Sequence, residues 1–158
     1  MKKIFFVYGA LVILVIVLIV WRLTAFSFDF NLPFISQKTA IINSTEIKLL
    51  VADDEKSKMI GLSNKRSLNK DTGMLFVFEE KGTHGFWMKN MKFPIDIIYL
   101  DDTTVVDIKK NVQPANKDAI NPEVYVPKAP SNRVLEVVAG VSDSLKITEG
   151  SQITFENL

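Results

Sequence analysis

A run of eighteen residues near the N-terminus constrains this chain more than any other feature. From Ile4 to Trp21, every residue except Gly9 is apolar or aromatic. As a helix that rises about 1.5 Å per residue, the run would reach about 27 Å, close to the hydrocarbon thickness of a bilayer. Lys2 and Lys3 precede the run, and Arg22 follows it. The run therefore predicts a transmembrane helix, because a core helix seldom lacks a polar face altogether.

The flanks of the run bear on whether it is a cleaved signal peptide or a retained anchor. The apolar region of a signal peptide is shorter, about 7–15 residues, and ends at a small-x-small cleavage site. The candidate site at residues 23–25 has leucine where a small residue is needed. We therefore expect an uncleaved signal anchor over residues 1–23, with a cleaved signal peptide as the alternative. More positive charge before the run than after it predicts a cytoplasmic N-terminus and an extracytoplasmic C-terminal domain at the cell membrane.

Residues 24–40 form a segment rich in phenylalanine. Phe26, Phe28 and Phe30 alternate with polar residues, and Pro33 interrupts the pattern. We expect a juxtamembrane tether that rests against the lipid headgroups or the domain. A strand that binds a partner protein is the alternative interpretation.

The remaining residues, 41–158, have the composition of an ordinary globular domain. From residue 40 onward the chain carries 17 acidic and 15 basic residues without large clusters of one sign. This balance excludes an electrostatically driven nucleic-acid binder, so no nucleic-acid partner is expected. One histidine, His84, and no cysteine cannot supply a zinc site, and no glycine-rich phosphate loop occurs. We expect no metal and no cofactor.

Short apolar or alternating segments with turn residues between them predict a mostly β domain. Helical signals are confined to residues 54–60, with Asp53 or Asp54 as the cap and Gly61 as the terminator, and to residues 142–146. The expected fold is α+β, a small barrel-like or strongly bent mixed sheet with one or two short helices. The expected strands cover residues 46–51, 74–78, 85–88, 95–100, 103–108, 123–126, 133–140 and 151–155.

Several short motifs follow one another in a fixed order along this domain. They are Gly61-Leu62, Gly73-Met74-Leu75-Phe76, Phe86-Trp87-Met88-Lys89-Asn90, Pro94-Ile95-Asp96-Ile97, Gln113-Pro114, Val134-Leu135-Glu136-Val137, Ala139-Gly140 and Gly150. The series resembles the DUF192 family, also called UPF0127, over about residues 46–155. The resemblance implies a compact β-barrel-like domain, often behind a bacterial signal or anchor segment, but no assigned activity or catalytic residue. Family members often have Pro-Cys where this chain has Pro114-Ala115.

The segment from Phe86 to Asn90 holds the densest candidate chemistry. In a strand, Trp87 and Lys89 would share one face. Trp87 is a candidate wall of a ligand cleft, with Lys89 and the Asn90 amide beside it and the Asp96 carboxylate converging on it. The structural alternative is a Trp–Lys surface pair, with Asn90 in a turn.

Three carboxylates are candidates for acid–base chemistry. Asp96 faces opposite to its apolar neighbours, so a buried position would require hydrogen bonds or a raised pKa. It would either accept backbone N–H groups or serve a ligand, paired with Glu79 or Glu136 as in a hydrolase. Alternation places Glu136 opposite Leu135 and Val137, on the expected solvent face.

Together these features lead to three hypotheses about function. The first is a membrane-anchored extracytoplasmic module that binds a small polar ligand, a glycan or an envelope protein. The second is a carboxylate-dependent hydrolase or lyase that acts on envelope material. The third is a structural or assembly module of the cell envelope.

Overall fold

The computed structural model describes residues 12–18, 37–116 and 120–158. Residues 12–18, inside the apolar run, are helical. Within these three ranges, no helix combines the length and the apolar character needed to cross a membrane. The rest of the expected anchor, and the expected tether as far as residue 36, lie outside the described residues.

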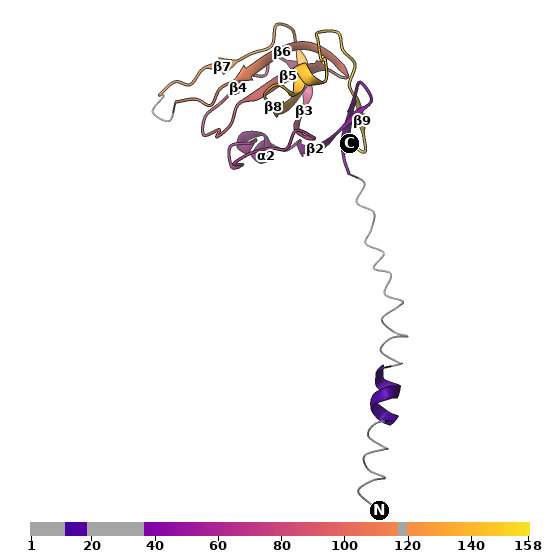
Figure 1. Ribbon diagram of the computed structural model, residues 1–158. Coiled ribbons are helices and arrows are strands. Elements are labelled where there is room, and N and C mark those ends of the chain that lie inside the picture. Colours follow the sequence, from indigo (N-terminus) through magenta and orange to yellow (C-terminus); the bar gives the residue numbers. More distant parts are fainter. Residues whose placement is uncertain (1–11, 19–36, 117–119) are drawn as a thin grey trace, which may run out of the picture. The chain divides into compact units, whose positions relative to one another are not determined.

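A curled seven-stranded sheet dominates the domain (Figure 1). The strands, in chain order, are β1 (Thr39–Ile42), β2 (Thr45–Ala52), β3 (Thr72–Gly82), β5 (Ile95–Asp101), β6 (Thr104–Val112), β8 (Ser131–Val138) and β9 (Thr154–Glu156). Their order in the sheet is β6-β5-β8-β3-β2-β1-β9. The pairing of β2 with β3 is parallel, and the other pairings in this sheet are antiparallel. The prediction of a mostly β, strongly bent mixed sheet is therefore confirmed.

A second, two-stranded sheet and two short helices complete the described domain. Strands β4 (Phe86–Trp87) and β7 (Val124–Tyr125) pair with each other and run side by side away from the main sheet (Figure 1). The described part of the domain also has two short helices, α2 (Glu55–Ile60) and α3 (Val141–Ser144). Helix α2 matches the sequence prediction because Asp54 accepts a hydrogen bond from the Ser57 N–H at 2.9 Å. Gly61 ends the helix with a positive φ of 50°.

One segment near the C-terminus joins both edges of the curled sheet. Just before β9, the Ser151 carbonyl accepts from the Val105 N–H at 2.9 Å, and the Ile153 N–H donates to the Thr103 carbonyl at 2.9 Å. The same segment then continues as β9, where Glu156 pairs with Thr39 on β1. The edge strand β6 is thereby tied to the segment that forms β9 at the opposite edge, and the sheet forms a half-barrel.

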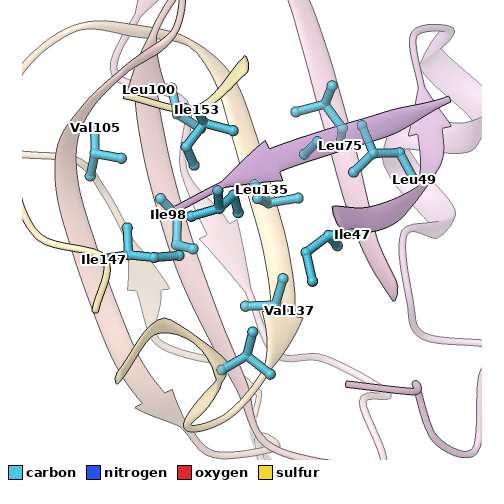
Figure 2. Close-up of a cluster of buried hydrophobic side chains, with 13 residues drawn as sticks. Ile47, Leu49, Leu75, Ile98, Leu100, Val105, Leu135, Val137, Ile147 and Ile153 are labelled. Carbon is cyan, nitrogen blue, oxygen red and sulfur yellow. The ribbon is translucent and has the colours of Figure 1, made fainter. Parts of the chain in front are cut away.

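Aliphatic side chains fill the inside of the curl (Figure 2). They come from strands on opposite sides of the half-barrel and from the loops before β9. Burying each large side chain contributes about 1.5–3 kcal/mol to folding, so this cluster is the main stabilising core. Its labelled members are Ile47, Leu49, Leu75, Ile98, Leu100, Val105, Leu135, Val137, Ile147 and Ile153.

A second buried cluster covers part of the outer face of the same sheet. Strand β5 contributes side chains to the inner cluster from one face and to the outer cluster from the other. Both of its faces are therefore covered, and its run from Ile95 to Leu100 is buried throughout. The outer cluster packs beneath the turn after α2 and beneath the β4 segment. Its members are Ala52, Leu62, Met74, Phe76, Met88, Ile95, Ile97, Tyr99, Val112 and Val134.

The first strand of the domain begins inside the segment that the sequence assigns to the tether. Strand β1 starts at Thr39, whereas the expected tether runs to residue 40. A two-residue turn joins β1 to β2 through Asn43 and Ser44, whose φ angles are 47° and 65°. Such left-handed pairs form the tight turns of hairpins, and asparagine tolerates that conformation well. The dipeptide Asn43-Ser44 is therefore the sequence feature from which this hairpin could be predicted.

Candidate functional site

A cleft of about 520 Å³ opens on the outer face of the sheet. One wall is formed by α2 and the turn after it, and the other by the segment from His84 to Met91. Strands β3 and β8 provide the floor. Its lining residues are Lys58, Met59, Ile60, Gly61, Leu62, Ser63, Phe76, Phe78, His84, Gly85, Phe86, Trp87, Lys89, Asn90, Met91 and Glu136.

Glu136 is the acidic residue on the floor of this cleft. It lies in the middle of β8, between Met74 on β3 and Ile97 on β5. Its exposed fraction is only 6%. Among the residues that the structure describes, none forms a hydrogen bond or ion pair with its side chain. Burial raises the pKa of Glu136 to about 8, so the carboxyl group is largely protonated at neutral pH.

The prediction that Glu136 faces solvent is wrong. The alternation itself is correct, because Leu135 and Val137 point into the inner core while Glu136 points to the outer face. The error lies in the assumption that the outer face is bare. Leu62 and Phe86 cover that face near Glu136 and turn it into the base of a cleft. The sequence offered no signal for this cover, because it depends on where α2 and β4 pack.

Aromatic side chains form much of the cleft wall. The rings of Phe76 and Phe86 meet edge to face, with centroids 4.9 Å apart. The rings of Phe78 and His84 are stacked at 3.6 Å. The Lys58 ammonium lies over the Phe78 ring, 5.0 Å from its centroid. The cleft therefore has apolar walls with cationic groups near its mouth.

Three of the residues that the sequence singled out do line this cleft. Trp87 is 54% exposed, and the Lys89 Nζ atom lies 5.7 Å from the Trp87 ring centroid. The expected Trp–Lys pair is therefore present, although β4 ends at Trp87 and Lys89 lies in the turn after it. Asn90 lies beside them in a turn with a φ of 62°, which asparagine adopts more readily than most residues. This backbone conformation is a structural reason for asparagine at that position.

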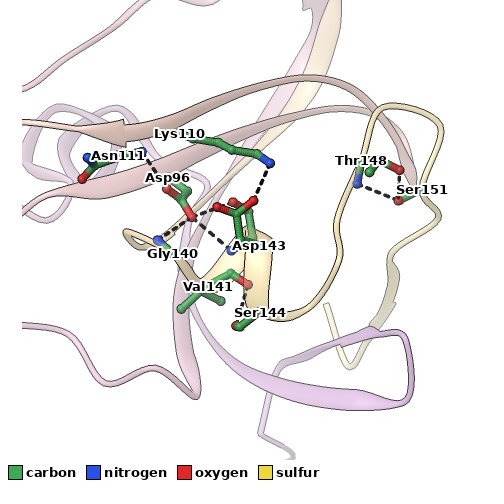
Figure 3. A network of polar contacts seen from close by, with 10 residues as sticks. Asp96, Lys110, Asn111, Gly140, Val141, Asp143, Ser144, Thr148 and Ser151 are labelled. Atoms are coloured by element: carbon green, nitrogen blue, oxygen red, sulfur yellow. Dashed lines mark hydrogen bonds and ion pairs between the residues drawn. The ribbon is translucent and has the colours of Figure 1, made fainter.

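Asp96 is not part of the cleft, contrary to the expected group with Trp87 and Asn90. It is fully buried on the same face of β5 as Ile98 and Leu100 of the inner core. Figure 3 shows the polar contacts around it. Its Oδ1 atom accepts from the Asn111 N–H at 2.8 Å, and Oδ2 accepts from the Gly140 N–H at 3.0 Å. Ser142 donates both its N–H and its hydroxyl to the same Oδ2 atom. These four hydrogen bonds match the structural alternative for Asp96, in which its carboxylate accepts backbone N–H groups.

The candidate carboxylates do not converge. Glu79 is exposed on β3 and is not among the cleft residues, and Asp96 lies on the other side of the sheet. In the described ranges, no group of three or more metal-ligating side chains occurs either. Of the three candidates, the cleft holds Glu136 alone. The paired arrangement that a two-carboxylate hydrolase requires is therefore not assembled here.

The comparisons with known proteins extend over nearly the whole domain. The sequence profile of DUF192, described as "Uncharacterized ACR", matches residues 37–155. Among curated proteins, none matches the chain. Crystal structures with a similar fold include the following two. One, of a proposed transcription regulator from Sinorhizobium meliloti 1021, shares 26% identity with a TM-score of 0.68, covering 77% of this chain and 95% of that one. The other is of a protein of unknown function from Novosphingobium aromaticivorans DSM 12444. It shares 25% identity with a TM-score of 0.65, and the match covers 75% of this chain and 83% of that one.

Proposed function

This chain belongs to the DUF192 family, and from that premise we propose that its domain binds a small polar ligand in the cleft above Glu136. The observation that carries the proposal is the buried carboxyl group on the floor of an aromatic-walled cleft. Ligand sites are mostly apolar concavities with a few polar groups that fix orientation. Titratable groups whose pKa is shifted by burial cluster at functional sites, and Glu136 in this cleft is such a group.

In this proposal each cleft residue has a distinct role. Glu136 contacts the polar group of the ligand that enters most deeply. Trp87 offers an exposed aromatic face, which suits a sugar or another polar ring. Lys89 and Asn90 contact polar groups of the ligand near the mouth. A glycan or an envelope protein would present such a group from a larger surface.

A thermal-shift screen on the full chain tests the proposal, with small polar molecules and glycans as the library. Trp87→Ala is the test variant, and Val124→Ala is the matched control. The two residues pair across β4 and β7 and are 54% and 53% exposed, but only Trp87 lines the cleft. We expect hits that raise the Tm of the wild type and of Val124→Ala but not that of Trp87→Ala. Equal responses of all three proteins would argue against the cleft.

We also propose that the apolar run Ile4–Trp21 anchors the protein in the cell membrane. The support comes from the length of the run and from the lysines before it. The domain would then lie outside the cytoplasm, within reach of envelope ligands. A reporter fused after Leu158 tests the orientation, and activity confined to the cytoplasm would overturn it.

Glu136 also favours a second candidate function, an enzyme with a single acid–base carboxyl group. Its pKa of about 8 suits proton transfer near neutral pH. Because Asp96 and Glu79 lie elsewhere, the reaction would be one that needs one carboxyl group, such as that of a lyase. The discriminating result is a ligand that the wild type converts and that Glu136→Gln binds without converting.

A further inference from the structure

The charged groups of the cleft are separated by depth. Glu136 lies on the floor, while Lys58 is half-buried and Lys89 is exposed at the mouth. His84 is the remaining titratable group of the lining, and its ring is stacked on Phe78. None of these three cationic or titratable side chains forms an ion pair with Glu136 within the described chain. The neighbours of Glu136 on β3 and β5, Met74 and Ile97, carry no charge. Tyr99 on β5 is within electrostatic range of Glu136, and burial raises the pKa of its hydroxyl so that it stays neutral.

We infer that the cleft binds an organic zwitterion, with its ammonium group against Glu136 and its anionic group beside Lys58 and Lys89. The inference rests on the proposed function and names the ligand class of the same site. It commits to a small molecule or headgroup that carries both charges a few bonds apart.

The floor of the cleft favours the ammonium group. A buried carboxylate needs a partner of opposite charge, and the described residues provide none. The rings of Phe76 and Phe86 lie nearby, and aromatic faces attract organic cations. Two rings of the same cleft already accept ammonium groups, since Lys58 lies 5.0 Å from the Phe78 centroid and Lys89 5.7 Å from that of Trp87.

The mouth of the cleft favours the anionic group. Lys58 and Lys89 both carry a positive charge there, and no carboxylate other than Glu136 lines the cleft. They would repel a simple cation but attract a phosphate or carboxylate attached to it. A zwitterion satisfies both ends of the cleft, whereas a simple cation or a simple anion satisfies only one.

Binding of the ammonium group requires Glu136 to ionise, and its proton passes to the solvent. Burial holds the pKa of the free carboxyl group at about 8. At pH 7, roughly nine-tenths of the molecules would therefore carry this proton and release it on binding. The affinity should rise on the order of 10–100-fold between pH 6 and pH 9, because less protonated Glu136 then has to be ionised.

Phosphocholine is the probe for calorimetric titrations of the full chain in phosphatidylglycerol nanodiscs. 3,3-Dimethylbutyl phosphate has the same shape without the cation, and choline has the cation without the phosphate. We expect phosphocholine to bind tightest, with close to one proton released at pH 7 in buffers of different ionisation enthalpy. Glu136→Gln should weaken phosphocholine binding roughly tenfold or more and abolish the proton release, because a charge-assisted contact is lost.

Two lysine variants locate the anionic end. Lys89→Gln should weaken phosphocholine binding about two- to fivefold, as for an exposed ion pair, but should not weaken choline binding, because the lost lysine only repels that cation. Lys70→Gln is the control, because Lys70 is exposed and does not line the cleft. Titrations in nanodiscs that contain phosphatidylcholine distinguish the two sources of this chemistry. If phosphocholine binds more weakly in these nanodiscs, the lipid headgroup competes for the cleft and is the occupant. If its binding is unchanged, the occupant is a free zwitterion.

Three results would overturn the inference. The first is equal affinity for phosphocholine and 3,3-dimethylbutyl phosphate, and the second is an unchanged phosphocholine affinity in Glu136→Gln; after either result the cleft would remain a ligand site of another class. The third is no binding of any of these probes to the wild type between pH 6 and pH 9. The proposed function would then be tested separately, by the thermal-shift screen that compares the wild type with Trp87→Ala.

Discussion

Ser142 donates two hydrogen bonds to one oxygen of Asp96, from its N–H at 3.0 Å and from its hydroxyl at 2.7 Å. Asp96 lies on β5, and Ser142 lies on α3, the helix that follows β8. The same carboxylate also binds the Asn111 N–H on β6. One buried side chain thus holds two strands and a helix in register.

Asp96→Asn should therefore lower the free energy of unfolding by about 2–4 kcal/mol, because the amide NH₂ would face donors that need an acceptor. Urea denaturation followed by circular dichroism measures the change. Asp143→Asn is the control, since Asp143 is an exposed carboxylate paired with Lys110, and its effect should be much smaller. A loss no greater than that of the control would contradict the anchoring role of Asp96.

Glu136 should make the stability of the domain depend on pH in the direction opposite to most carboxylates. Its folded pKa of about 8 lies above the ordinary value of 4.5, so the folded state binds the proton more tightly. The free energy of unfolding should fall as the pH rises from about 4.5 to about 8, by roughly 3–5 kcal/mol. Urea titrations between pH 5 and pH 9 measure this. In Glu136→Gln most of the decline should disappear, and an identical decline in both proteins would refute the assignment.

Asp107 should show the conventional dependence. It is buried, and burial alone would raise its pKa. Hydrogen bonds from the Lys109 ammonium at 2.7 Å and from the backbone N–H groups of Lys128 and Ile108 outweigh burial and lower the pKa. Asp107 therefore stabilises the fold above its unfolded pKa, and this contribution is lost as the pH falls through the lowered folded pKa.

The corresponding prediction is that Asp107→Asn lowers the free energy of unfolding at pH 7 by about 1–3 kcal/mol and reduces the loss of stability in acid. Urea titrations between pH 2 and pH 7 compare the two proteins. A parallel acid response in the variant and the wild type would show that Asp107 does not contribute.

Gly73 should not tolerate a side chain. A Cβ atom there would lie 2.8 Å from Leu135 Cδ1 and 3.2 Å from the Glu136 carbonyl oxygen. Gly73→Ala should therefore cost about 1–3 kcal/mol, because β3 and β8 would have to separate. Gly82→Ala on the same strand is the control, since its Cβ would lie 3.4 Å from the His84 ring, an ordinary contact. Thermal unfolding of both variants measures the difference, and similar Tm values would contradict the prediction.

Local patterns in the sequence predicted much of this fold. Strand β5, the capped helix α2 and its terminating Gly61 all depend on neighbouring residues, and all three appear where expected. The hairpin of β1 and β2 is not predicted, because the phenylalanine pattern places residues 24–40 together in a tether, whereas β1 begins at Thr39. The parallel pairing of β2 with β3 leaves no local signature, since it depends on how α2 returns the chain.

The candidate site was less predictable than the fold. Trp87, Lys89 and Asn90 were found because their residue types are unusual within one short segment. Asp96 was expected beside them, but its position on the opposite face of β5 places it in the inner core. The sequence makes Glu136 a candidate, yet its burial depends on packing from α2 and β4, which lie far from it in the sequence.

The pairing of Glu156 with Thr39 brings the two ends of the domain's sequence together. The first strand therefore has no neighbour on that side until the last strand is available. A contact between such distant positions forms late, because the loop that it closes is almost the whole domain. While the chain is being synthesised, one edge of β1 therefore stays unpaired until β9 has been made. A chain that ends before β9 would leave that edge free to pair with strands of other molecules.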